Sequence, residues 1–127
     1  MIYQGETITL SGKFREVGKT DYINLNLYKI VARVTCPKAN EPLYTDGNKK
    51  TYNALTFSTD STDGNLKITL SDDYTYTFAI PGVCTKHMIG ECTCEIAWID
   101  KTTLKPILSD KKVLFTVNPS ILGRSLV

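Results

Sequence analysis

Four side chains in the second half of the chain have the chemistry of zinc ligands: Cys84, His87, Cys92 and Cys94. Two of them, Cys92 and Cys94, alternate along a stretch that continues with Ile96 and Trp98, so they fall on the apolar face of an extended strand. A buried cysteine behaves there as a small hydrophobic residue. We therefore expect reduced core cysteines without metal. A zinc site and a disulfide between Cys36 and one of the other three are the alternatives.

No group of residues forms a recognisable catalytic constellation. His87 is the only histidine, and nothing near it in sequence supplies the nucleophile and orienting group that a general base needs. Asp72 and Asp73 lack the spacing of a calcium-binding loop. Glu91 and Glu95 would need a cleft to act as a glycosidase pair. We expect a protein that is not an enzyme and carries no cofactor.

Two other groups of residues could bind a macromolecular partner. Tyr44 and Tyr52 lie on or near the long irregular stretch 37–50 and could stack on a sugar or on a protein surface. Asn118-Pro119 ends the last predicted strand, and apolar residues follow it: Ile121, Leu122, Leu126 and Val127. Apolar side chains beyond the final strand need burial. We therefore expect these four residues, with the two tyrosines, to form a protein interface.

Apolar and polar residues alternate with a period of two in seven stretches, which is typical of half-buried strands. The stretches are marked by Ile8, Leu10 and Phe14; Ile23, Leu25 and Leu27; Leu55 and Phe57; Leu66, Ile68 and Leu70; Tyr74, Tyr76, Phe78 and Ile80; Cys92, Cys94, Ile96 and Trp98; and Val113, Phe115 and Val117. In the second stretch the alternation shifts, because Ile30 and Val31 are adjacent. This shift predicts a β-bulge near Tyr28-Lys29.

Turn residues separate the predicted strands. Asp63-Gly64 predicts a tight hairpin turn, Ser71-Asp72-Asp73 predicts a second turn, and Pro81-Gly82 ends a strand. No window predicts a helix of ordinary length. Together these features predict an all-β, immunoglobulin-like β-sandwich of about seven strands, with a small β-barrel as the alternative. We assign residues 1–118 to this domain and 119–127 to an apolar C-terminal tail.

The composition suits one globular domain and excludes some partners. The hydrophobic fraction is 42%, and 15 basic against 13 acidic residues give a net charge of +2, so we expect no nucleic-acid partner. No stretch approaches the ~20 apolar residues that span a bilayer, so we expect no membrane insertion. The first residues have neither a basic start nor an apolar run, which predicts folding in the cytoplasm.

The order of these features resembles the immunoglobulin-like N-terminal domain of phage baseplate upper proteins and related small virion proteins. The first strand of that family opens with Gly-Glu/Asp-Thr, as Gly5-Glu6-Thr7 does here. A strand of the form Tyr-x-Phe-x-Ile-Pro, here 76–81, leads to Thr85, a short turn and Gly90. The last strand, here 115–117, is followed by Asn-Pro.

The resemblance implies a non-enzymatic structural component of a phage virion. Such a chain would serve as an adaptor or decoration protein in a repeated tail, baseplate or head assembly. It would contact copies of itself and other virion proteins, and it would be located in the virion after assembly in the host cytoplasm. The alternative function is a carbohydrate- or receptor-binding β-sandwich module that uses Tyr44 and Tyr52 against a surface carbohydrate.

Overall fold

The computed structural model describes residues 1–15, 18–102, 106–107 and 112–126, with the backbone alone for 106–107 and 125–126. Its strands are β1 (Ile2–Tyr3), β2 (Ile8–Gly12), β3 (Tyr28–Thr35), β4 (Tyr44–Thr45), β5 (Thr51–Tyr52), β6 (Leu55–Ser58), β7 (Thr69–Leu70), β8 (Tyr76–Ile80), β9 (Gly90–Asp100), β10 (Pro106–Ile107) and β11 (Lys112–Asn118). The helices in the described ranges are short: η1 (Leu25–Leu27), η2 (Gly64–Leu66), α1 (Gly82–Thr85) and α2 (Ile121–Leu126).

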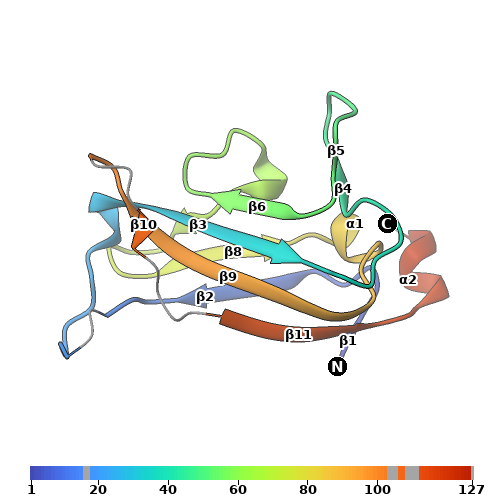
Figure 1. Cartoon of the computed structure of the whole chain (residues 1–127), viewed down its shortest axis with the longest axis horizontal. Helices are drawn as coiled ribbons and strands as arrows, with labels where there is room; N and C mark the ends of the chain where they lie inside the picture. The colour runs from blue at the N-terminus through green and yellow to red at the C-terminus, as the bar shows by residue number, and fades with distance from the viewer. Residues whose placement is uncertain (16–17, 103–105, 108–111, 127) are drawn as a thin grey trace.

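Two sheets form a β-sandwich, which confirms the predicted all-β fold (Figure 1). One sheet has the order β1-β11-β9-β3-β6, with β10 paired to the end of β9, and the other has the order β2-β8-β7. β1 runs parallel to β11, whereas the other pairs in both sheets are antiparallel. In immunoglobulin nomenclature the two sheets read A′-G-F-C-C′ and B-E-D, which is the strand order of an immunoglobulin-like sandwich.

The core lies between the two sheets. Trp98, Ile96, Phe57 and Phe78 are each at most 5% exposed, as the alternation predicts. The rings of Phe57 on β6 and Phe78 on β8 lie 5.0 Å apart, so they join the sheets directly. Phe115 on β11 is only half-buried and packs at the margin of this core.

The prediction of a strand through Ile23, Leu25 and Leu27 is wrong. Residues 25–27 form η1, because the side chain of Asn24 accepts a hydrogen bond from the Asn26 N–H and starts a helical turn. Leu25 is fully buried, but Leu27 is 66% exposed, so the two do not share a face. The hydrophobic alternation shifts near Tyr28 because η1 ends there. β3 begins after this turn without the predicted bulge.

Asp63-Gly64 does not make the predicted hairpin turn. The Asp63 carboxylate accepts a hydrogen bond from the Asn65 N–H and caps η2 instead. The predicted strand at residues 66–70 is correspondingly short, since β7 covers only its last two residues. β4 lies in the irregular stretch 37–50 and pairs with β5, which directly follows that stretch, in a small hairpin that projects from the sandwich (Figure 1).

Pro81-Gly82 ends β8 as predicted, and Ser71 to Asp73 form the turn between β7 and β8. Of the helices in the described part of the chain, none has the length and apolar character to cross a membrane.

Candidate interaction surface at the α2 end of the sandwich

The predicted apolar tail folds as a short helix, α2, at one end of the sandwich (Figure 1). Pro119 follows β11 directly and has no N–H to continue the sheet. Ser120 then caps the helix: its hydroxyl oxygen accepts a hydrogen bond from the Gly123 N–H at 3.0 Å, and its carbonyl accepts one from the Arg124 N–H at 3.1 Å. Residues 120–124 are therefore held in place by local hydrogen bonds.

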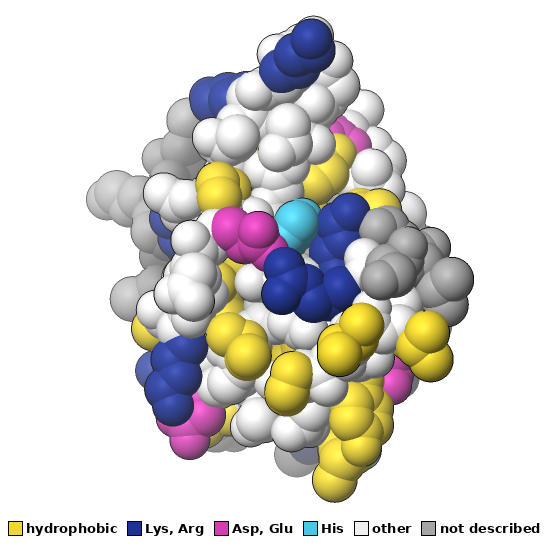
Figure 2. Space-filling view, turned by 90° about the vertical axis from the view of Figure 1, so that its right-hand side faces the viewer, with side chains coloured by type: hydrophobic (Ala, Val, Ile, Leu, Met, Phe, Trp, Pro, Cys, Tyr) yellow, Lys and Arg dark blue, Asp and Glu magenta, His cyan; other side chains and the backbone are white. Residues whose placement is uncertain are grey.

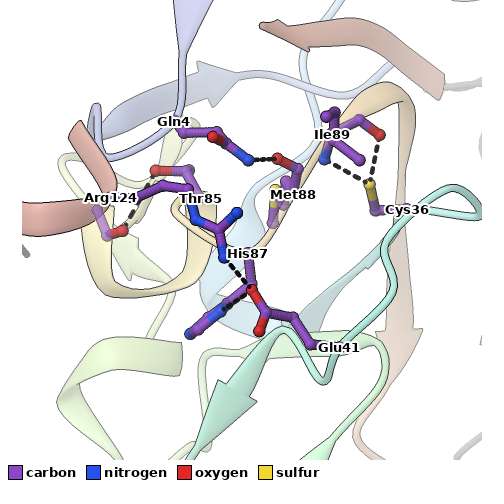
Figure 3. Close-up of polar contacts among 9 residues, drawn as sticks. Gln4, Cys36, Glu41, Thr85, His87, Met88, Ile89 and Arg124 are labelled. Carbon is purple, nitrogen blue, oxygen red and sulfur yellow. Dashed lines mark hydrogen bonds and ion pairs between the residues drawn. The ribbon is translucent and has the colours of Figure 1, made fainter. Parts of the chain in front are cut away.

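The side chain of Gln4 connects the start of α2 to the rest of the domain through hydrogen bonds. Its side chain is buried, being 4% exposed. The amide nitrogen donates to the Met88 carbonyl at 2.9 Å, and the amide oxygen accepts from the Ser120 N–H at 3.0 Å. One side chain thus links the segment after β1, the turn before β9 and the cap of α2. Figure 3 shows its contact with Met88.

The helix also touches the segment after β1 through two glycines. Gly5 has φ of +90°, and a β-carbon there would lie 2.8 Å from the Gly123 Cα. A β-carbon on Gly123 would in turn lie 2.8 Å from the carbonyl carbon of Gln4. Only glycine at both positions allows this backbone-to-backbone approach.

Thr85 also holds the segment after β1 in place. It is the fully buried last residue of α1, and its hydroxyl donates to the Glu6 carbonyl at 2.7 Å. The hydroxyl oxygen also accepts from the Gly5 N–H at 3.2 Å. No buried side-chain nitrogen or oxygen among the described residues lacks a hydrogen-bond partner, so this junction is fully satisfied.

Glu41 lies in the irregular stretch 37–50 and contacts side chains of α2 and of the turn before β9. Its Oε1 lies 2.7 Å from His87 Nδ1 and 3.0 Å from Arg124 Nη2 (Figure 3). The hydrogen bond from His87 lowers the pKa of the Glu41 carboxyl, and the charges of His87 and Arg124 lower it further. His87 therefore contacts a carboxylate on the surface, and among the described residues no cysteine is placed with it to hold a metal ion.

Apolar side chains surround this cluster. Ile121 is 87% exposed and Leu122 is 73% exposed, although α2 is fixed to the domain beneath them. Figure 2 shows this end of the molecule, with the histidine between acidic and basic side chains and with hydrophobic side chains gathered beside and below them. Of the other predicted interface residues on the tail, Val127 lies outside the described residues, as does the side chain of Leu126.

The two tyrosines predicted at the interface lie on the β4–β5 hairpin instead. Tyr44 is only 7% exposed, because its hydroxyl turns inward to donate to Asp63 at 2.7 Å and to accept from Asn65 at 3.2 Å. Tyr52 is half-buried, stacks on Tyr44 with 6.1 Å between ring centres, and donates to Asp46. The Tyr44 ring is therefore covered, whereas Tyr52 is partly exposed, and a protein interface at these two residues stays a prediction.

All four cysteines are buried, and the strand pattern predicts this for Cys92 and Cys94. Burial raises the pKa of the Cys84 thiol to about 12 and that of Cys94 to about 11. Within the described ranges, no three His, Cys, Asp or Glu side chains are placed to hold a metal ion. The metal content of the protein stays a prediction.

The residues that build this surface were missed by the sequence analysis. Gln4, Glu41, Thr85 and Gly123 meet only through contacts between distant positions, so no local pattern marks them. One sequence feature could have indicated the close packing of the tail, namely Gly123 among its apolar residues. Glycine is unfavourable inside a helix unless close packing requires it.

Comparison of the chain with protein-family models, with curated proteins and with solved structures found no match.

Proposed function

We propose that this chain is a non-enzymatic structural component of a phage virion, an adaptor or decoration protein in a repeated tail, baseplate or head assembly. The proposal combines the sequence resemblance to small virion proteins with the surface on α2. Its partners are copies of itself and other virion proteins, and the virion is its final location.

The observation that carries the proposal is the exposure of Ile121 and Leu122 on a helix that is already fixed in place. Burying a leucine-sized side chain is worth about 1.5–3 kcal/mol. Association also costs entropy when flexible segments become ordered. Here the Gln4 hydrogen bond and the glycine contact have ordered the helix beforehand, which leaves more of the burial energy for binding a partner.

The test replaces the two exposed side chains together, Ile121→Ser with Leu122→Ser, and follows assembly into particles by sedimentation. We expect an unchanged circular dichroism spectrum and a loss of assembly. The matched control is Leu27→Ser, which removes a leucine that is 66% exposed on η1, at the opposite end of the sandwich. The control should assemble normally.

A truncation after Pro119 extends the same test to the whole tail. We expect the shortened chain to keep the sandwich and to lose assembly, as the division into residues 1–118 and 119–127 predicts. Normal assembly of either the double variant or the truncated chain would refute the proposed role of α2. A truncated chain that fails to fold would show that the tail belongs to the domain, and the double variant would then decide the question.

A further inference from the structure

Two of the four thiols face each other across neighbouring strands. The antiparallel register of β3 and β9 pairs Val34 with Cys94 and Thr35 with Thr93. Continued by one residue, this register sets Cys36, which directly follows β3, opposite Cys92. Cys36 is among the groups that raise the pKa of the Cys92 thiol, as expected of neighbouring side chains.

The spacing of directly opposed positions in an antiparallel pair suits a disulfide. Directly opposed residues of an antiparallel pair have Cα atoms about 4.5–5.5 Å apart, and disulfides span about 4.4–6.8 Å between Cα atoms. The other thiols are placed differently. Cys94 faces Val34 on one side and Val113 on the other, and Cys84 is buried in α1. Cys36 and Cys92 are therefore the pair that the register brings together.

Cys36 is the thiol that reagents reach first. It is 7% exposed, against 1% for Cys92. Its sulfur is held in position by the Ile89 backbone, since it donates to the Ile89 carbonyl at 3.2 Å and accepts from the Ile89 N–H at 3.3 Å (Figure 3). Burial raises the pKa of Cys92 well above its usual range, and the hydrogen bond with Cys36 raises it further, so Cys92 remains protonated beside its partner.

We propose that Cys36 and Cys92 are an oxidisable pair, which forms a cross-strand disulfide when the protein meets hydrogen peroxide. In the first step the Cys36 thiolate attacks one peroxide oxygen. An S–O bond forms, the O–O bond breaks, and the departing hydroxide takes a proton to become water. In the second step the Cys92 sulfur loses its proton and attacks the Cys36 sulfur. The S–S bond forms, the S–O bond breaks, and a second water leaves. Two thiols are oxidised by two electrons, and one peroxide is reduced to two waters.

The bond would fix the start of the loop that reaches the α2 surface. Cys36 lies at the start of the segment that contains Glu41, and Glu41 contacts His87 and Arg124. A link to β9 at this point restrains the path of that segment. Disulfides persist in oxidising surroundings and are reduced in the cytoplasm. The cross-link would accordingly appear after the protein leaves a cell, and it requires no assembly partner.

The test measures thiols and mass in the isolated chain. Reduced protein is desalted under nitrogen, treated with an equimolar amount of hydrogen peroxide, denatured and titrated for free thiols. We expect the thiol count to fall from four to two, with a mass loss of two hydrogen atoms and no dimer. Cys36→Ser and Cys92→Ala should abolish this change, whereas Cys84→Ala and Cys94→Ala should preserve it.

Several results would overturn the proposal. These are four thiols after treatment, a gain of oxygen without a disulfide, an intermolecular dimer, or the same mass loss in Cys36→Ser. Cys36→Ser keeps a hydroxyl that can still bond to Ile89, so it should remain folded if Cys92→Ala does not. Because the readout is the mass of one chain, its failure is distinguishable from a failure of the proposed assembly role.

Discussion

Gly5 and Gly123 pack backbone against backbone, with no room for a side chain on either. The contact joins the segment after β1 to the middle of α2, and Gly5 also has the positive φ that glycine tolerates best. The orientation of Ile121 and Leu122 toward solvent depends on this contact, because it determines which face of α2 lies against the domain.

The first prediction is that Gly123→Ala releases α2 from the domain. In an unconstrained helix alanine is favoured over glycine by about 0.5–1 kcal/mol. Here the added methyl group would overlap the Gln4 carbonyl, so the helix must move away. We expect trypsin cleavage after Arg124 to accelerate about tenfold, which corresponds to a loss of about 1.4 kcal/mol in docking, with the circular dichroism of the sandwich unchanged.

The control for this variant is Gly64→Ala. A β-carbon on Gly64 meets no atom within 4 Å, and the backbone there does not have a positive φ. Its cleavage after Arg124 should match that of the parent protein. An unchanged cleavage rate in Gly123→Ala would show that the helix can shift without undocking.

A second prediction concerns the core between the sheets. Trp98→Ala or Phe78→Ala should lower the free energy of unfolding by about 3–5 kcal/mol, because each leaves a cavity among buried neighbours. Urea denaturation followed by circular dichroism measures the loss. Leu114→Ala is the comparison, since Leu114 is 72% exposed on β11 and should change stability by no more than about 0.5 kcal/mol.

The third prediction is that the folded protein becomes less stable against unfolding at alkaline pH. Burial raises the pKa of Cys84 from 9.0 to about 12 and that of Tyr76 from 10.0 to about 12. Both groups ionise more easily in the unfolded chain. Their contribution to stability is therefore complete below about pH 9 and is lost as the pH rises toward 12. The urea midpoint should fall between pH 8 and pH 11, and an equal midpoint at both values would contradict the prediction.

The sequence predicts the long strands well and the connections poorly. Alternation along β8 and β9 is direct evidence of a strand, because one face is buried throughout and the other is not. The same alternation misleads at Leu25 and Leu27, where a capping asparagine starts a helical turn. Asp63 is similar, since an aspartate before glycine can cap a helix as readily as it can turn a hairpin.

The candidate surface was predicted only in outline. Ile121 and Leu122 stand out because apolar residues follow a strand-ending proline. The groups that hold them in place cannot be found in this way, since Gln4 and Ser120 are 116 positions apart in the sequence. Cys36 and Cys92 likewise become neighbours only through the register of two strands, which depends on the packing of the whole domain.

The parallel pairing of β1 with β11 has a consequence for how the domain folds. Asn118 donates to the Ile2 carbonyl across 116 positions, and the glycine contact with α2 lies at a similar separation. Contacts of such long range form slowly, because a large loop must close before they provide any stabilisation. During synthesis on the ribosome, the edge of β11 and the α2 surface are therefore completed only after the rest of the sandwich has been made. A partner that recognises α2 would consequently select chains that have finished folding.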